Sequence, residues 1–277
     1  MTLEEQIGEI LATAYYTEEL KLRDISPETL ALRRHQLAYF TAWLGTRPAT
    51  AQTANLFLAE LRHKGLARAT VRSYYAALRP YLAWLNIPYK AKLKRDKRLP
   101  HYHSKADLDR ILDQVTARTD RWAKLKPRDR LIITTLARTG LRRAELTSLT
   151  CQDIKDGYLF VNQGKGEKDR VVPLTIKLAK DITDYIRQRK LASSDRLFPI
   201  TPAAIYHLVK HYAVRAGLPD ITPHSLRHYF ATRLMTKGAE LRKVQELLGH
   251  QDISTTAIYL DVAPAHLKET IKLLEEE

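Results

Sequence analysis

Cysteine is almost absent from this chain of 277 residues, in which Cys151 is the only one. One cysteine forms neither an intramolecular disulfide nor a cysteine metal cluster, so we interpret Cys151 as a small buried hydrophobe. The chain also has no apolar run long enough to span a bilayer. Its first residues are acidic and lack the apolar segment of a signal peptide. These absences argue against a secreted or membrane protein and predict a cytoplasmic one.

Cations strongly outnumber anions. The chain has 46 Lys and Arg against 31 Asp and Glu, a formal net charge of +15 in 31.9 kDa. A positive field of this size favours a polyanionic partner. Nucleic acid is the first candidate, and an anionic membrane surface is the second. With 44% hydrophobic residues, the chain has enough apolar side chains for real cores and is not disordered by composition.

Residues 1–90 predict a compact helical domain. Apolar residues recur there at helical spacing, and the connections are short, which indicates four or five helices. Ser26 followed by Pro27 is typical of a helix start. Gly65 is expected to break the chain before a longer helix over residues 70–85.

Residues 101–277 predict a second, larger domain. Ser104 opens its first helix in capping-box fashion, and Gly140 is expected to end a later one. Residues 158–161 and 171–174 have strand composition and predict a β-hairpin. Most of the remaining sequence is expected to be helical.

Two stretches gather cations that suit contact with DNA: the start and body of the 70–85 helix, and residues 91–100, which read as a basic interdomain linker. Cations at a helix N-terminus favour phosphate binding. The alternatives are a solvated basic helix face and a solvated hinge. The residues that we expect to contact DNA are Lys64, Arg68, Thr70, Arg72, Arg79, Lys94 and Arg95.

Four separated segments carry the candidate chemistry. In chain order they contribute Arg142 with Glu145, Lys165 between two glycines of the hairpin, His224 with Arg227, and His250 followed nine residues later by Tyr259. Gly249 is suited to end the helix before His250, because glycine takes the left-handed conformation without a Cβ clash. Ser254 is a good N-cap for a short helix that would carry Tyr259.

This set of side chains suits phosphoryl transfer without a metal. Two guanidiniums can bind the charge that develops on the nonbridging oxygens, and an ammonium can protonate the leaving alkoxide. An imidazole can accept the phenol proton, and the phenol can form a covalent intermediate. No acidic cluster is present to hold Mg²⁺, so we expect neither metal nor cofactor. Each group also has an ordinary interpretation: a structural salt bridge for Arg142 and Glu145, helix-start residues for His224 and Arg227, and a core residue for Tyr259.

The motifs that contain these residues resemble the boxes of the tyrosine recombinases, the phage-integrase family. They are Thr-Gly-Leu-Arg-x-x-Glu-Leu at 139–146, the Gly-Lys-Gly hairpin, His-x-Leu-Arg-His at 224–228, and Leu-Gly-His followed by the tyrosine. The short chain is most similar to the Xer-type members. The resemblance implies a mainly α fold with a small β-hairpin or sheet. It further implies a C-shaped DNA clamp of two domains, a SAM-like helical core-binding domain and a mixed α/β catalytic domain.

The resemblance also implies a role for each residue, transferred by position. Arg142 and Arg227 would bind the scissile phosphate, Lys165 would be the general acid for the 5′-oxygen, His224 would assist as base, His250 would stabilise the phosphoryl group, Tyr259 would be the nucleophile, and Glu145 would support Arg142. The choice of Lys165 over Lys168 rests on the position in the family motif. His228 is expected to pack behind the site, and Arg143 stands where many relatives carry a small or apolar residue.

The implied function is site-specific recombination of duplex DNA through a 3′-phosphotyrosine and a Holliday junction. Xer-type resolution of chromosome or plasmid dimers is the first interpretation, and integration of a mobile element or virus is the alternative. A noncatalytic DNA-binding protein on the same fold is the alternative from another class. The need for an activating partner protein is left open.

The last residues predict an amphipathic helix with Leu267, Ile271 and Leu274 on one face. Such a face packs either on its own domain or on a neighbouring subunit. The resemblance favours the second choice, which would give a tetramer on two DNA sites.

Overall fold

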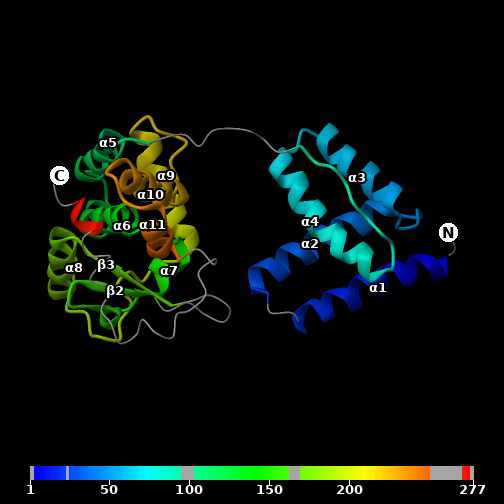
Figure 1. Ribbon diagram of the computed structural model, residues 1–277, viewed down its shortest axis with the longest axis horizontal. Helices are drawn as coiled ribbons and strands as arrows, with labels where there is room; N and C mark the ends of the chain where they lie inside the picture. Colours follow the sequence, from blue (N-terminus) through cyan, green and yellow to red (C-terminus); the bar gives the residue numbers. More distant parts are fainter. Residues whose placement is uncertain (1–2, 23–24, 95–102, 162–168, 250–269, 275–277) are drawn as a thin grey trace. The chain divides into compact units, whose positions relative to one another are not determined.

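The chain divides into two compact units (Figure 1), Met1–Pro100 and His101–Glu277. Each unit has its own hydrophobic core. The predicted class, mainly helical with a small sheet, is confirmed. The computed structural model describes residues 3–22, 25–94, 103–161, 169–249 and 270–274.

Helices pack around an aromatic-rich core in the first unit. Phe57 lies at its centre and contacts the rings of Phe40, Trp43 and Tyr74 at centroid distances of 5.1 to 5.6 Å. Such tilted and edge-on ring contacts add to the stabilisation from apolar burial. The helices are α1 (Leu3–Leu22), α2 (Pro27–Leu44), α3 (Ala51–His63) and α4 (Arg68–Trp84).

Local signals located the first unit's helix boundaries well. Ser26 caps α2 as predicted, because its hydroxyl accepts a hydrogen bond from the Thr29 backbone N–H at 3.2 Å. Gly65 follows α3 with φ +81°, and α4 begins three residues later. Ala91 and Leu93, at the start of the expected linker, pack partly buried against the first core. The N-terminal end of that stretch therefore belongs to the packing of the first unit.

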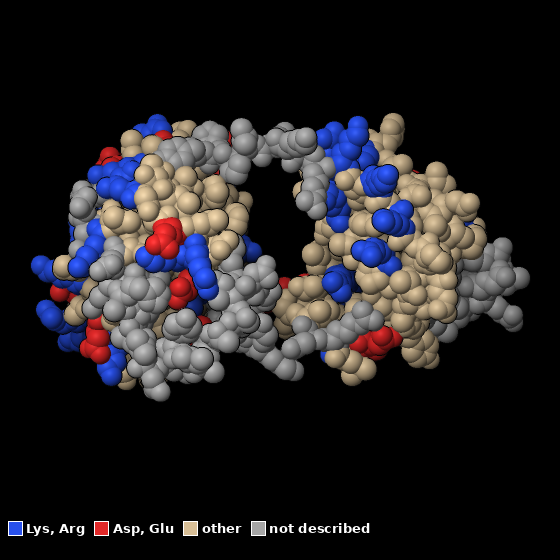
Figure 2. Space-filling view, viewed as in Figure 1, with Lys and Arg blue, Asp and Glu red and all other residues tan. Residues whose placement is uncertain are grey.

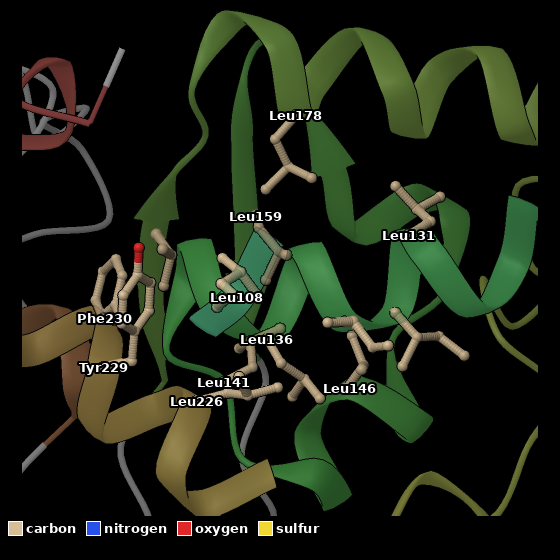
Figure 3. Close-up of a cluster of buried hydrophobic side chains, with 14 of the residues drawn as sticks. Leu108, Leu131, Leu136, Leu141, Leu146, Leu159, Leu178, Leu226, Tyr229 and Phe230 are labelled. Atoms are coloured by element: carbon tan, nitrogen blue, oxygen red, sulfur yellow. The ribbon is translucent and has the colours of Figure 1, made fainter. Parts of the chain in front are cut away.

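The second unit is built around α6. In Figure 1 this helix lies in the middle of the unit, and α5, α8, α9 and α10 all contact it. The buried cluster in Figure 3 includes Leu131 and Leu136 of α6, Leu159 of the sheet, and Phe230 of α10. The helices are α5 (Lys105–Thr116), α6 (Lys126–Thr139), α7 (Arg143–Ser148), α8 (Ile176–Arg189), α9 (Pro202–Arg215), α10 (Pro223–Thr236) and α11 (Leu241–Leu248), with 3-10 turns at Ala123–Leu125 and Cys151–Asp153.

The sheet has three antiparallel strands in the order β1 (Ile154–Lys155), β2 (Tyr158–Val161) and β3 (Arg170–Pro173). The predicted hairpin is β2–β3, with Val161 paired to Arg170 at the end where the chain passes from β2 to β3. β1 was not predicted, because two residues are too short to show an alternating pattern.

Two expectations about individual residues are settled in the second unit. Cys151 is 8% exposed, and burial raises the pKa of its thiol, as expected of a small buried hydrophobe. Ile271 and Leu274 are 2% and 4% exposed within the core of their own unit. The described part of the tail therefore packs on the core of its own domain. Leu267 lies outside the described residues.

Candidate active site

The site is built on the tight connection between α6 and α7. Gly140 ends α6 in the left-handed conformation, with φ 65° and ψ 19°. A Cβ added at Gly140 would lie 2.6 Å from Cδ1 of Phe230 and 2.9 Å from Cδ2 of Leu248. Glycine is required here both by backbone conformation and by space, and Arg142 follows two residues later as the N-cap of α7.

Glu145 holds Arg142 through both of its carboxylate oxygens. The Arg142 backbone N–H donates to Oε2 at 2.7 Å, and its Nη1 donates to Oε1 at 2.9 Å. The Arg142 side chain is 38% exposed, whereas that of Glu145 is only 8% exposed. A buried carboxylate therefore orients a guanidinium that still reaches the surface.

Arg170 is the second partner of Glu145. Its Nη1 and Nη2 donate to Oε1 and Oε2 at 2.9 and 2.7 Å, the bidentate geometry that suits a carboxylate. Its Nε donates to the backbone carbonyl of Leu247, near the end of α11, at 2.9 Å. The sequence motifs assigned no role to Arg170. The usable signal was its alternation with buried Val172, because a cation on the buried face of a strand needs a partner.

These contacts determine the charge state of Glu145. Burial acts to raise the pKa of this carboxyl, but the hydrogen bonds and positive charges of Arg170 and Arg142 outweigh it, and the pKa is lowered. Glu145 is therefore a carboxylate at neutral pH, and the cluster of one anion and two cations keeps a net positive charge.

Arg227 lies in α10 and is 8% exposed. Its Nη1 donates to the Gly140 carbonyl and its Nη2 to the Leu248 carbonyl, both at 2.6 Å. Arg227 thus joins the α6–α7 connection to the end of α11, the same two segments that Arg170 and Glu145 join. The structure brings both predicted phosphate-binding arginines to one place.

His224 occupies the first turn of α10 and is exposed, one turn before Arg227. Thr222 caps this helix, because its hydroxyl accepts from the Ser225 backbone N–H at 3.2 Å. The expectation that His228 packs behind the site is wrong, because His228 is exposed. It lies one residue past Arg227, and the helical turn of about 100° per residue carries it away from the buried face. Lys165, His250, Tyr259 and Ser254 lie outside the described residues.

Cations of the first unit gather on α4. Arg68, Arg72 and Arg79 are exposed, and their spacing places them within roughly 40° of arc on one face of the helix. Figure 2 shows Lys and Arg side chains clustered over α3 and α4. The N-cap residue of α4, Ala67, makes no side-chain cap hydrogen bond to the first turn of the helix.

The other predicted DNA contacts are distributed less regularly. Lys64 is exposed and forms an ion pair with Glu60 at 2.8 Å. Thr70 is exposed on the side of α4 away from the arginine face, and Lys94 is exposed after the helix. Arg95 lies outside the described residues.

No group of three or more His, Cys, Asp or Glu side chains suited to a metal occurs in the described part of the chain. Among the helices described, none is both long and apolar enough to cross a membrane.

The phage integrase family model matches residues 102–266 of the chain. Tyrosine recombinase XerA of Pyrococcus furiosus is 35% identical over 282 residues, which cover 98% of this chain and 94% of the relative. Tyrosine recombinase XerD of Yersinia pestis is 34% identical, over 89% of this chain and 91% of the relative.

Solved structures agree with this assignment. The XerH site-specific recombinase bound to difH substrate in a pre-cleavage complex has a TM-score of 0.65 and 25% identity, over 95% of this chain and 82% of that one. An integrase of the Tn1549 transposon in complex with transposon right end DNA has a TM-score of 0.70 at 20% identity, over 93% of this chain and 97% of that one, which supports the fold alone. The chain belongs to the phage integrase family, as a Xer-like tyrosine recombinase that cleaves and rejoins DNA.

Proposed function

We propose that this recombinase uses Tyr259 to form a 3′-phosphotyrosine at a specific site in duplex DNA, and that its task is the resolution of chromosome or plasmid dimers. The full set of proposed catalytic residues is Arg142, Lys165, His224, Arg227, His250 and Tyr259, with Glu145 as support.

One observation supports this proposal above all. Arg227 and Arg170 both connect the α6–α7 region to the end of α11. Arg227 joins the Gly140 and Leu248 carbonyls, and Glu145 joins Arg142 to Arg170, which in turn holds Leu247. Residues 247 and 248 directly precede Gly249 and His250. A phosphate placed among these groups would meet the guanidiniums of Arg142 and Arg227.

The chemistry follows from charge development. His224 accepts the phenol proton of Tyr259 as the phenol oxygen attacks phosphorus in line. The attack places negative charge on the nonbridging oxygens, which Arg142 and Arg227 stabilise. The P–O5′ bond breaks, and Lys165 donates a proton to the leaving oxygen. A 5′-hydroxyl of the partner strand later attacks phosphorus and releases the tyrosine, so the phosphodiester is conserved without an external energy source.

The first unit supplies the sequence-independent part of DNA binding in this proposal. Arg68, Arg72 and Arg79 form one cationic stripe, and contacts of this kind with phosphates position a duplex without reading its sequence. The units Met1–Pro100 and His101–Glu277 would then be a core-binding domain with its basic linker and a catalytic domain.

Covalent trapping tests the function. The full chain is incubated with fragmented DNA from its source organism, the mixture is denatured, and protein-linked DNA is captured and sequenced. Tyr259→Phe should abolish adducts, whereas Tyr206→Phe, which removes a hydroxyl from a partly exposed tyrosine on α9, should not. Bound DNA without any adduct from the unaltered chain would favour either a noncatalytic DNA-binding protein or a recombinase that cleaves only with an activating partner protein.

The captured sequences also separate the two recombinase functions. One or a few loci on a chromosome or plasmid would support dimer resolution. The similarity to XerA and XerD favours this function. Adducts confined to the ends of a mobile element would instead support integration.

A tetramer on two DNA sites is part of the same proposal. Docking of the C-terminal helix on a neighbour would have to release Ile271 and Leu274 from the core of their own unit. Light scattering of the full chain on duplexes that carry the trapped site should show four subunits per two duplexes. A mass of one subunit per duplex at saturation would contradict this assembly.

A further inference from the structure

Arg170 is a buried cation in a place where a sheet would ordinarily carry an apolar side chain. It begins β3, pairs with Val161 at the end of the hairpin, and is 9% exposed. A buried guanidinium is costly unless its charge and its donors are matched. Its partners therefore indicate why it is there.

The partners of Arg170 are all parts of the candidate active site. Both Glu145 oxygens accept from Arg170, and each of these oxygens also accepts one hydrogen bond from Arg142. The third Arg170 donor reaches the Leu247 carbonyl. A Cβ added at Gly249 would lie 3.0 Å from Cδ of Arg170 and 3.2 Å from its Nη1, so the guanidinium lies directly against the residue that precedes His250.

We propose that Arg170 is a positioning residue that neutralises Glu145, so that the charge of Arg142 remains available for the DNA phosphate, and that holds the end of α11 beside it. This inference rests on the proposed function of the same site. Arg170 itself need not touch the substrate.

Charge balance explains why a second arginine matters. Glu145 with Arg142 alone is a neutral pair, and a phosphate gains little from a neutral pair. Adding Arg170 makes the cluster of one carboxylate and two guanidiniums net positive. In a partly buried site the effective dielectric constant is well below that of water, so this extra positive charge strengthens the attraction to a phosphate more than it would in water.

The test measures the rate of covalent adduct formation by the full chain at saturating protein, on a duplex carrying the trapped site. Arg170→Met should lower this rate by about 10- to 100-fold, the usual effect of removing a residue that orients a site group. The double variant Arg170→Met/Glu145→Gln should be faster than Arg170→Met alone, because the carboxylate that competes for Arg142 is gone. If Arg170→Met does not fold, Arg170→Gln, which also removes the positive charge, replaces it in both variants under the same criteria.

Arg118→Met is the matched control for lost stability. Arg118 also binds a carboxylate with two nitrogens, donating to Asp120 at 2.7 and 3.2 Å, and its side chain is largely buried. Its other partners are Tyr212 and Asp129, which make no hydrogen bond to Glu145 or Arg142 among those described. Arg118→Met should lower the melting temperature and leave the rate unchanged.

Three results would overturn the inference: a double variant slower than Arg170→Met, an unchanged rate in Arg170→Met, or an equal loss of rate in Arg118→Met. An unaltered chain that forms no adduct would instead refute the proposed function.

Discussion

The glycine between α6 and α7 offers the sharpest test of how the site is built. Gly140→Ala forces a Cβ into the left-handed conformation and places it 2.6 Å from a Phe230 ring carbon and 2.9 Å from a Leu248 methyl. Phe230 is fully buried and Leu248 is 7% exposed, so neither neighbour moves aside cheaply. The same peptide unit carries the carbonyl that accepts from Arg227.

The expected loss of folding stability in Gly140→Ala has two parts. The left-handed conformation of an alanine costs about 1–2 kcal/mol, and overpacking of a full core costs about 1–3 kcal/mol. Gly217→Ala is the matched control, because Gly217 follows α9 with φ +73° and has no atom within 4 Å of the place that a Cβ would occupy. Gly217→Ala should therefore show only the cost of the left-handed conformation. For a unit of this size the second part corresponds to roughly 2–12 °C of melting temperature.

Scanning calorimetry of the full chain measures the difference in melting temperature between the two variants, in the unfolding transition that both substitutions shift. Gly140→Ala should melt below Gly217→Ala and should also form the covalent adduct more slowly, because displaced Phe230 and Leu248 disturb both carbonyls that hold Arg227. Equal melting temperatures for the two variants would refute the reasoning, since the packing contribution would then be absent.

Three further predictions concern single side chains. Arg227→Lys leaves at least one of two buried carbonyls unpaired and should lower the free energy of unfolding by about 1–3 kcal/mol; unchanged urea denaturation would contradict this. The folded-state pKa of Glu145 lies below its ordinary value of 4.5, so its stabilisation is present above pH 4.5 and is lost as the pH falls through the folded pKa. Glu145→Gln should therefore flatten the acid side of the stability profile, and a profile as steep as before would argue against the assignment. Arg72→Ala should reduce the slope of log K for DNA against log salt by about 1, and an unchanged slope would remove Arg72 from the interface.

The sequence carried much of the local structure because short-range rules act within a few residues. Ser26 and Ser104 cap helices as predicted, since each hydroxyl accepts from a backbone N–H three residues later. Gly140 and Gly249 both end helices in the left-handed conformation, as their positions after apolar helical segments indicated. The recombinase motifs likewise identified the family, because they combine residue types and spacings along the whole second domain.

Contacts between distant segments were decided only by the tertiary structure. Nothing near Arg170 in the sequence indicates that it binds Glu145, 25 residues earlier, and Leu247, 77 residues later. The packing of Leu274 in the core of its own unit was equally beyond a local pattern. The sequence by itself thus determined helix ends, composition and family, because these depend on neighbouring residues. Which cation neutralises the buried carboxylate depends on how β3, α7 and α11 pack, and only the folded chain decides that.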